Sequence, residues 1–469
     1  MNTNIFREYD IRGVVGEQID AETVEVLARA IGVFLHRGGA RRIAVGHDAR
    51  ESSPGFAEIL IRGLNECGLD VAFLGLVPTP VVYHACHTRD VDGGVMVTGS
   101  HNPPHHNGFK ISLGKTTLFG PQIQEIKQIA LQAETPTLGS VPPAGRTTPL
   151  DVLDDYITDI TSRISLGPRK LKAVIDAGNG AGGVTAVPVY EKLGVELVEL
   201  YTDPDPAFPN HHPDPTVPEN LADVQAAVLR DNADVGIAFD GDGDRIGVVD
   251  ETGRIIWGDE LMILFSRSVL AERPGATIIA EVKCSQNLFD EIERLGGTAI
   301  MERAGHSIIK ARMKQTGAVL AGEMSGHIFF ADRFYGFDDA TYAGARLFEI
   351  LSRTDKKLSK LFDGVPETFS TPELRIDCPD EIKFQVVNDV ADHFAPNHRV
   401  ITIDGARIVF ENGWGLVRAS NTQAILVMRF EAHSPERLNE IRAEVEGFTK
   451  RSISKHSSAP PVGSARDQD

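Results

Sequence analysis

Three aspartates at alternate positions, Asp240, Asp242 and Asp244, stand in the segment "DGDGDR". Apolar residues precede and follow it, which indicates two strands joined by a turn that gathers the carboxylates. Carboxylates this close repel one another unless a cation or hydrogen-bond donors balance them, and oxygen ligands suit Mg²⁺ or Ca²⁺. We therefore expect a metal site here, against the alternative of a solvated acidic turn. An EF-hand is excluded because its sixth position, which requires glycine, holds Arg245.

A second candidate centre is Ser100, where the apolar run of "VMVTGSHNPPHHNGFK" ends in a polar loop. The neighbouring His101 suggests a hydrolase. However, successive side chains of an extended segment point to opposite sides, so the two residues are expected to be poor partners. The G-x-S-x-G frame of a nucleophile elbow is also missing. Pro103 and Pro104 restrict the backbone. We therefore expect a serine presented as a fixed nucleophile, against the alternative of a rigid surface turn.

Two weaker motifs could recognise a sugar and a phosphate. In "GEMSGH", Glu323 and Ser325 could bind vicinal hydroxyls, although a plain loop explains the motif equally well. In "LVRASNTQAILVMRFEA", a guanidinium group with hydroxyl and amide donors suits a phosphate, and the alternative is an exposed hairpin turn. The predicted phosphate-binding residues are Arg418, Ser420, Asn421 and Thr422.

The segment "IDAGNGAGG" matches the spacing of a dinucleotide fingerprint through Gly178, Gly180 and Gly183. Glu196 and Glu199 lie near the position expected for an acidic partner, so an NAD-dependent dehydrogenase is one hypothesis. Nothing else in the chain forms a hydride-transfer site. We therefore favour tight packing between a strand and a helix as the reason for these glycines.

The composition disfavours several classes of partner. The chain has 469 residues and a formal net charge of −19, which disfavours nucleic acid and anionic membranes because both require basic surface. Its four cysteines form no C-x-x-C pair, as expected in a reducing compartment. No signal peptide is visible, and no apolar run approaches the roughly 20 residues of a membrane helix. We therefore expect a cytoplasmic protein.

Short apolar runs alternate with amphipathic segments, which is typical of α/β domains. Three segments share one pattern, an apolar strand that breaks into a polar loop with glycine: "DGGVMVTGSHN", "DVGIAFDGDGD" and "GAVLAGEMSGH". This repetition indicates one supersecondary unit used in three successive domains. Because ligands bind beyond the carboxyl ends of the strands in open α/β sheets, we expect the three loops to converge.

Pro- and Gly-rich stretches indicate the domain boundaries. One linker-like segment covers residues 135–149, and further boundaries fall near residues 255 and 367. The end of the chain lacks apolar periodicity, which is typical of a disordered tail. The predicted domains are residues 1–148 with Ser100, 149–254 with the three aspartates, 255–366 with Glu323, 367–455 with Arg418, and a disordered tail at 456–469.

Five motifs in a fixed order make the chain resemble the α-D-phosphohexomutase family: "YDIRG", "TGSHNPPHHNGFK", "DGDGDR", "GEMSGH" and "RASNT". Within that family the chain is most similar to the bacterial bifunctional phosphomannomutase/phosphoglucomutase group, over nearly its whole length. The resemblance implies four domains around a central cleft. Three would be similar mixed α/β domains, and the fourth a smaller C-terminal α+β domain.

The resemblance also implies roles for single residues. Ser100 matches the active-site serine, which is phosphorylated in the active enzyme. The implied magnesium ligands are Ser100, Asp240, Asp242 and Asp244. The implied catalytic positions are Ser100, Arg12, His101, Lys110 and His306, with Lys110 and His306 as candidates for proton transfer or charge support. The implied substrate-binding positions are Tyr9, Arg245, Lys283, Glu323, Ser325, Arg418, Ser420, Asn421 and Thr422.

The reaction implied by the resemblance interconverts hexose 1-phosphate and hexose 6-phosphate, of mannose, glucose or both. It would use phosphorylated Ser100 and a hexose 1,6-bisphosphate that serves as intermediate and activator. Met324, where phosphoglucosamine mutases commonly carry glutamine, favours glucose and mannose. The alternatives are a phosphoglucosamine mutase, a magnesium-dependent sugar phosphatase, a dehydrogenase and a non-catalytic sensor of sugar phosphates. We expect Mg²⁺ as cofactor, small sugar phosphates as ligands, and a monomer, with a homodimer as the alternative.

Overall fold

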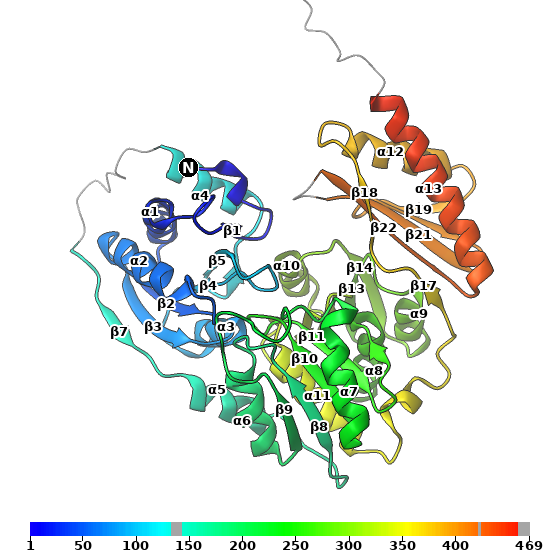
Figure 1. Ribbon diagram of the computed structural model, residues 1–469, viewed down its shortest axis with the longest axis horizontal. Helices are drawn as coiled ribbons and strands as arrows, with labels where there is room; N and C mark the ends of the chain where they lie inside the picture. The colour runs from blue at the N-terminus through cyan, green and yellow to red at the C-terminus, as the bar shows by residue number, and fades with distance from the viewer. Residues whose placement is uncertain (133–142, 421–423, 458–469) are drawn as a thin grey trace, which may run out of the picture. The chain divides into compact units, whose positions relative to one another are not determined.

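The computed structural model of the chain describes residues 1–132, 143–420 and 424–457. The chain divides into two compact units, residues 1–300 with 305–363 and residues 364–469 with 301–304. The first unit contains three sheets, and a fourth sheet lies in the second unit (Figure 1). The predicted fold class, three similar mixed α/β domains followed by an α+β domain, is confirmed. The exact domain boundaries stay predictions.

The first sheet has the strand order β1-β5-β4-β2-β3-β7, with β6 beside β5. β2, β3, β4 and β7 run parallel, whereas β5 is antiparallel to both of its neighbours in that order. Helix α1 packs on α2 and α4, while α3 packs on β2 and β4. The strands are β1 (Ile11–Val14), β2 (Arg42–His47), β3 (Asp70–Leu76), β4 (Gly93–Val97), β5 (His106–Leu113), β6 (Thr116–Thr117) and β7 (Thr147–Pro149). The helices are α1 (Ala21–Arg37), α2 (Ser53–Glu66), α3 (Thr79–Thr88) and α4 (Pro121–Leu131), after a short 3-10 turn at Thr3–Ile5.

The second sheet has the order β12-β11-β10-β8-β9. β9, β8 and β10 are parallel, and β11 is antiparallel to β10. Helix α7 packs on β8 and β10, and α5 packs on α6. The strands are β8 (Lys172–Asp176), β9 (Glu196–Leu200), β10 (Val235–Phe239), β11 (Ile246–Asp250) and β12 (Ile255–Ile256). The helices are α5 (Leu153–Ser162), α6 (Gly183–Leu193) and α7 (Ala222–Asp231), with a 3-10 turn at Pro218–Leu221.

The third sheet has the order β14-β13-β15-β16. β13 and β15 are parallel, and β16 is antiparallel to β15. The strands are β13 (Thr277–Glu281), β14 (Thr298–Glu302), β15 (Leu320–Gly322) and β16 (Ile328–Phe330). The helices are α8 (Gly258–Glu272), α9 (Gln286–Arg294), α10 (His306–Thr316) and α11 (Ala340–Ser352), with a 3-10 turn at Leu358–Phe362.

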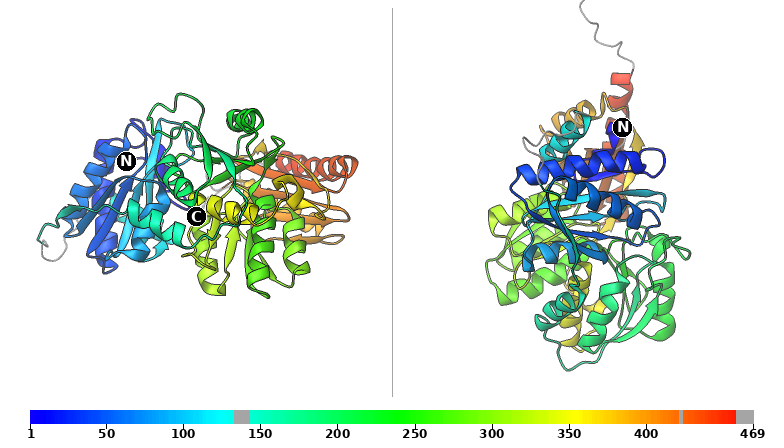
Figure 2. Two further views of the ribbon diagram at one scale, coloured as in Figure 1. Left: turned by 90° about the horizontal axis from the view of Figure 1, so that it is seen from below. Right: turned by 90° about the vertical axis from the view of Figure 1, so that its left-hand side faces the viewer.

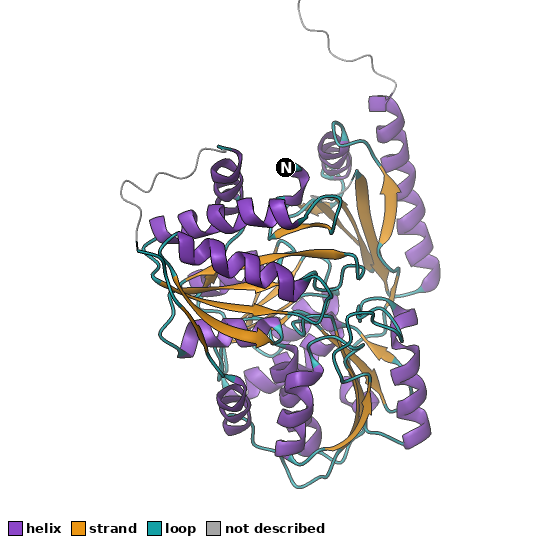
Figure 3. Cartoon of the chain, turned by 60° about the vertical axis from the view of Figure 1, so that its left-hand side comes forward, coloured by secondary structure: helices purple, strands orange, loops and turns teal. Residues whose placement is uncertain are grey.

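These three sheets share one local topology around their polar loops (strands in orange, Figure 3). In each sheet a buried parallel strand is followed by an antiparallel neighbour, as in β4–β5, β10–β11 and β15–β16. The connections are the serine loop (residues 98–105), the metal loop (240–245) and the sugar loop (323–327). The feature that repeats, as predicted from the sequence, is therefore a polar loop that connects a buried parallel strand to its antiparallel neighbour.

The fourth sheet has the order β17-β22-β21-β20-β19, with β18 also beside β22, and every pairing is antiparallel. Helices α12 and α13 pack on each other and on its central strands, and Figure 2 shows α13 in red along them. The strands are β17 (Phe369–Ser370), β18 (Leu374–Asp377), β19 (Arg399–Ile401), β20 (Ala406–Phe410), β21 (Gly413–Ala419) and β22 (Ile425–Ala432). The helices are α12 (Lys383–Phe394) and α13 (Pro435–Ser457). Among the helices of the described residues, none has both the length and the apolar character needed to cross a membrane.

Asp339 joins helices α11 and α5 through a buried carboxyl group. It caps α11 by accepting the backbone N–H of Tyr342 at 2.8 Å, and the Tyr156 hydroxyl of α5 donates to its Oδ2 at 2.8 Å. Its side chain lies in the core, with 1% of the residue exposed. Burial raises the pKa of Asp339 to about 7, and the hydrogen bonds offset this effect only in part. The folded state therefore binds a proton at this position more tightly than the unfolded state, in which the pKa of aspartate is about 3.9.

We expect Asp339 to make the fold less stable as the pH rises. The stabilisation is complete below the unfolded pKa of about 4 and is lost as the pH passes the folded pKa of about 7, so it amounts to at most about 4 kcal/mol. Asp339→Asn keeps an acceptor for the Tyr342 amide but cannot ionise. The measurement is thermal unfolding of both proteins between pH 5 and pH 8. The melting temperature of the wild type should fall relative to the variant as the pH rises, and parallel curves would contradict the assignment.

Candidate active site

Ser100 lies at the centre of the serine loop, and 1% of the residue is exposed. Its hydroxyl donates to Asp240 Oδ2 of the metal loop at 2.9 Å and lies 3.2 Å from His101 Nδ1. The prediction that Ser100 and His101 are poor partners was therefore wrong. Ser100 has a φ of 49°, in the left-handed region, so the rule for an extended chain does not apply to this pair. Burial, with the nearby guanidinium groups of Arg245 and Arg12, holds the pKa of His101 well below its usual range.

A buried pair, Asp48 and Arg50, fixes the backbone of the serine loop. The guanidinium group of Arg50 donates to the carbonyls of Ser100, Asn102 and Pro103, each at 2.6 Å, and to the carbonyl of residue 106 at 2.9 Å. Asp48 Oδ2 accepts from Arg50 Nε at 3.1 Å and from the hydroxyl of residue 98 at 2.7 Å. Arg12 binds the other side of the loop through Asn102 Oδ1 at 2.9 Å. The stiffness predicted from the prolines thus depends largely on two charged side chains.

The metal loop gathers three fully buried carboxylates, as predicted. Each of Asp240, Asp242 and Asp244 brings an oxygen within 4.8 Å of the other two. Asp240 Oδ1 accepts the backbone N–H groups of Asp244 and Arg245, at 3.1 and 3.2 Å. In contrast, Oδ1 of Asp242 and Oδ1 of Asp244 are buried and accept no hydrogen bond from the described residues. Carboxylate oxygens that are buried and available in this way fit a hard divalent cation.

The ammonium group of Lys110 provides the positive charge that the triad requires. It lies 2.7 Å from Asp242 Oδ2 and 2.5 Å from Asp244 Oδ2, and Thr79 adds a hydroxyl donor to Asp242 at 2.5 Å. Burial and the other two carboxylates raise the pKa of Asp240 well above its usual range. Burial also acts to raise the pKa of Asp242, but Lys110 and the hydrogen bonds reverse the shift and lower it.

Glycines allow the loops to meet backbone to backbone. A Cβ atom at Gly241 would lie 2.5 Å from the carbonyl oxygen of Ser100, and one at Gly180 would lie 2.8 Å from the carbonyl oxygen of Gly241. A Cβ atom at Gly183 would lie 2.1 Å from the carbonyl oxygen of Thr202, the residue that follows β9 and its turn. The glycines of the dinucleotide-like motif therefore serve close packing, which is the interpretation favoured from the sequence.

The sugar loop joins the metal loop through its last residue, and the metal loop in turn contacts the serine loop. Arg245, at the end of the metal loop, donates from Nε to His327 Nε2 at 3.0 Å. Glu323 accepts the backbone N–H of Gly305 at 2.7 Å, just before the predicted site residue His306. The ring of His306 in turn lies edge-on to Tyr9, with 6.2 Å between ring centroids. The predicted convergence of the three loops is thus confirmed.

Two predicted residues lie at the border of the sugar loop. Lys283 Nζ is 3.7 Å from Glu281 Oε1, and Glu281 also accepts the backbone N–H of Met324 at 3.3 Å. Ser325 lies in the same loop and is partly exposed. The structure therefore places Ser325 in the sugar loop with Glu323, and Lys283 beside that loop.

The predicted phosphate-binding residues belong to the second unit. Arg418, at the end of β21, pairs with Asp404 Oδ2 at 3.0 Å, and Lys383 donates to the carbonyl of Ser420 at 2.6 Å. Asn421 and Thr422 lie outside the described residues.

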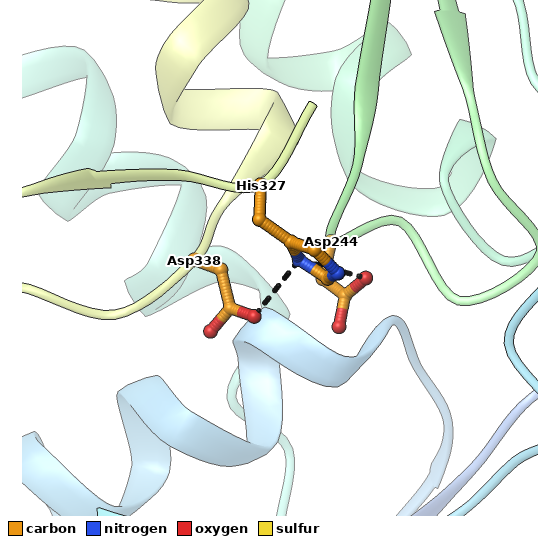
Figure 4. Close-up of side chains that lie close together, drawn as sticks. All are labelled: Asp244, His327 and Asp338. Atoms are coloured by element: carbon orange, nitrogen blue, oxygen red, sulfur yellow. Dashed lines mark ion pairs between the residues drawn. The ribbon is translucent and has the colours of Figure 1, made fainter. Parts of the chain in front are cut away.

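Sequence reasoning missed several residues of this site. Asp48 and Arg50 follow β2 directly, so the rule that ligands and loops gather at the carboxyl ends of strands could have found them. Asp338 and Lys310 carry no local signal. They reach the site through α10 and the connection before α11, where Lys310 Nζ donates to Asp338 Oδ1 at 2.9 Å and Asp338 Oδ2 lies 3.1 Å from His327 Nδ1 (Figure 4).

The chain is a multidomain protein with three α/β sheets whose polar loops converge. A buried serine beside a carboxylate triad is an arrangement suited to phosphoryl transfer. Family models for phosphoglucomutase/phosphomannomutase match almost the whole chain. Domain I matches residues 3–137, domain II residues 154–253, domain III residues 257–369 and the C-terminal domain residues 373–447.

Individual relatives agree with these matches. The chain is 49% identical to a phosphomannomutase/phosphoglucomutase of Pseudomonas putida, over 94% of both chains. It is 46% identical to a phosphoglucomutase of Neisseria meningitidis, over 94% of this chain and 97% of the relative. A crystal structure of a phosphoglucomutase/phosphomannomutase family protein from Burkholderia thailandensis superposes with a TM-score of 0.90 at 42% identity, covering 98% of this chain and 99% of that one. The chain belongs to the phosphoglucomutase/phosphomannomutase family.

We expect Arg50→Lys to loosen the serine loop, because one ammonium group cannot bind carbonyls on several sides at once. The change should destabilise the protein by about 2–4 kcal/mol and speed amide hydrogen exchange between residues 99 and 106. Urea unfolding and hydrogen exchange measure the two effects. Arg62→Lys is the matched control, since the Arg62 side chain is 61% exposed and its pair with Glu25 spans 3.5 Å, so a change within about 0.5 kcal/mol is expected. Unchanged exchange in the serine loop would contradict the role of Arg50.

Proposed function

We propose that the chain is a phosphohexomutase that interconverts hexose 1-phosphates and hexose 6-phosphates, of mannose, glucose or both. The observation that carries the proposal is the hydrogen bond of the buried Ser100 hydroxyl to Asp240 of the carboxylate triad, at 2.9 Å. Relatives that share nearly half of the sequence are named for this pair of reactions, and Met324 stands where phosphoglucosamine mutases commonly carry glutamine.

Mg²⁺ is the cofactor that the triad fits best. Its residues supply only oxygen ligands, and two of their buried oxygens have no hydrogen-bond donor among the described residues. The residues that would hold the ion are Ser100, Asp240, Asp242 and Asp244. When bound, the ion would neutralise the oxygens of a phosphoryl group carried by Ser100.

The reaction would begin with Ser100 phosphorylated. The free hydroxyl at carbon 6 of a hexose 1-phosphate attacks this phosphorus, a bond from phosphorus to O6 forms, and the bond to Ser100 Oγ breaks. The proton of the attacking hydroxyl passes to a base, and Oγ takes up a proton. The resulting hexose 1,6-bisphosphate turns around in the site. Oγ then gives up its proton and attacks the phosphorus of the phosphate on carbon 1. The bond from this phosphorus to O1 breaks, which restores phosphorylated Ser100, and O1 takes up a proton, which leaves hexose 6-phosphate.

Lys110 and His306 differ in what they can offer this reaction. Lys110 is bonded to two carboxylates, so its ammonium group serves as charge support for the triad. His306 lies at the start of α10 with Nδ1 buried and without a hydrogen bond to the described residues, which leaves it as the candidate for proton transfer. Arg12 and His101 lie near Ser100 in the same domain. Arg12 donates to Asn102 of the serine loop, and His101 Nδ1 lies beside Ser100 Oγ.

The remaining predicted residues would bind the substrate. Glu323 and Ser325 would contact sugar hydroxyls, with Tyr9, Arg245 and Lys283 nearby. Arg418 and Ser420, with Asn421 and Thr422, would bind the phosphate that does not react. A cytoplasmic location and a monomer, with a homodimer as the alternative, stay predictions.

We expect Ser100→Ala to abolish mutase turnover, with a loss of at least about a thousandfold, because the variant has no oxygen to carry the phosphoryl group. The assay is ³¹P NMR of glucose, mannose and glucosamine 1-phosphates with Mg²⁺. Ser266→Ala is the control, since Ser266 is a buried serine of α8 whose hydroxyl has no partner among the described residues. Net release of inorganic phosphate by the wild type would indicate a phosphatase. Exclusive use of glucosamine 1-phosphate would indicate a phosphoglucosamine mutase.

Removal of Mg²⁺ by a chelator should stop turnover reversibly. In Asp242→Asn the Mg²⁺ concentration for half-maximal rate should rise about tenfold or more, because one charged ligand of the ion is lost. The matched control is Asp223→Asn, an exposed aspartate of α7 in the same sheet region. A metal titration of the thermal melting temperature follows binding without turnover. An unchanged Mg²⁺ requirement in Asp242→Asn would contradict the ligand assignment.

A further inference from the structure

Residues 201–217, which we call the proline loop, connect β9 to the 3-10 turn before α7 without a helix or a strand. Loops of more than about 12–15 residues without secondary structure are uncommon in compact domains and are usually functional. None of the residues to which the proposed function gives a role lies in this loop, although it contacts the serine loop. Prolines restrict its backbone at Pro204, Pro206, Pro209, Pro213 and Pro215.

The proline loop supplies a hydrogen bond that the serine loop does not receive from its own domain. Arg50 binds three carbonyls of the serine loop, those of residues 100, 102 and 103. The carbonyl between them, that of His101, instead accepts from His212 Nε2 of the proline loop at 2.5 Å. Two domains therefore share the binding of successive carbonyls in the loop that carries the serine.

An ion pair anchors the proline loop one residue before this bond. His211 Nε2 lies 3.0 Å from Oδ2 of Asp176, which is fully buried at the end of β8, and His211 Nδ1 lies 3.1 Å from the carbonyl oxygen of His212. Both partners are acceptors, so both ring nitrogens of His211 carry a proton. Burial acts to lower the pKa of His211, but Asp176 outweighs burial and raises it. The backbone of His212 is thus tied to the second sheet.

Packing holds the proline loop on both sides of His212. Before it in the chain, the ring of Phe208 is buried, and its centroid lies 5.6 Å from the guanidinium carbon of Arg50, within the range of a cation–π contact. After it, Pro213 lies against the metal loop, since a Cβ atom at Gly241 would be 3.5 Å from Pro213 Cγ. The imidazole of His212 therefore projects from a backbone that is fixed at three neighbouring points.

Ser100 lies directly before the carbonyl that His212 binds. Its φ of 49° is uncommon for a residue with a side chain, so neighbouring bonds must hold the backbone there. Because Arg50 binds the carbonyl of Ser100 itself and His212 binds the next one, two successive peptide groups are fixed. We propose that His212 is a positioning residue, which holds the serine loop from the second domain so that Ser100 Oγ faces the metal loop. This inference rests on the proposed function in taking Ser100 as the carrier of the phosphoryl group.

Two substitutions of His212 separate the hydrogen bond from the volume of the side chain. The amide of Gln reaches about as far from the backbone as Nε2 and can donate, so His212→Gln keeps the bond. Met has a similar length but no donor, so His212→Met leaves the His101 carbonyl without its partner. We expect kcat for glucose 1-phosphate to fall about tenfold or more in His212→Met and to stay within about threefold of wild type in His212→Gln, because a small displacement of a nucleophile slows the chemical step. KM should stay within about threefold in both.

Two kinetic results would overturn the proposal. Equal kcat values in the two variants would mean that the hydrogen bond contributes nothing beyond packing. A rise in KM with unchanged kcat would mean that His212 acts on substrate binding and not on the serine.

Hydrogen exchange tests the positioning without turnover. Amides between residues 99 and 106 should exchange at least about threefold faster in His212→Met than in His212→Gln, while exchange in α12 should be the same in both. Equal exchange in the serine loop would overturn the proposal. Long-range ¹H–¹⁵N spectra of the histidine-labelled wild type should show a proton on His212 Nε2, assigned by the signal missing from His212→Gln. An unprotonated Nε2 would overturn the proposal even where His212→Met folds poorly. If the wild type turns over no sugar phosphate, the proposed function fails, whereas exchange and the spectra still decide the role of His212.

Discussion

A buried ammonium group between two carboxylates is the interaction on which the rest of the site depends. Three aspartates without solvent repel one another, and Lys110 from β5 places a positive charge against Asp242 and Asp244, which counteracts burial and lowers the pKa of Asp242. Because β5 belongs to the first sheet and the aspartates follow β10 of the second, this charge balance also joins two domains. The N-terminal end of α3 adds to it, since the Thr79 hydroxyl donates to Asp242 Oδ2, while the Thr79 backbone N–H donates to the backbone carbonyl of Asp242. A metal ion bound to the triad would therefore enter a region where the chain already places positive charge.

The serine loop shows a second use of buried charge. Arg50 gathers carbonyls that would otherwise need water, and this fixes the unusual backbone of Ser100 without a helix or strand.

The sequence was sufficient to predict the parts of the site that follow strands. The serine, metal and sugar loops each begin where an apolar run ends, and their convergence follows from the topology of α/β sheets. Asp338 and Lys310 could not be predicted, because they reach His327 from a loop and a helix with no shared spacing in the chain. The contact between Ser100 and His101 was missed for a different reason. The rule used there assumes extended backbone, whereas Ser100 has a positive φ and its carbonyl accepts from Arg50, which lies 50 residues away in the sequence.

The absence of a side chain at Gly241 has a consequence for how the site behaves between states. Backbone contact, not charge, sets how closely the serine loop approaches the metal loop, because the carbonyl of Ser100 occupies the space that a Cβ atom would need. If charge set the distance between the two loops, that distance would change with ionic strength, with metal occupancy and with the charge on a phosphorylated serine. A distance set by steric contact does not change in this way. The closest approach of the two loops is thus limited by backbone contact, which does not depend on the charge of the side chains around it.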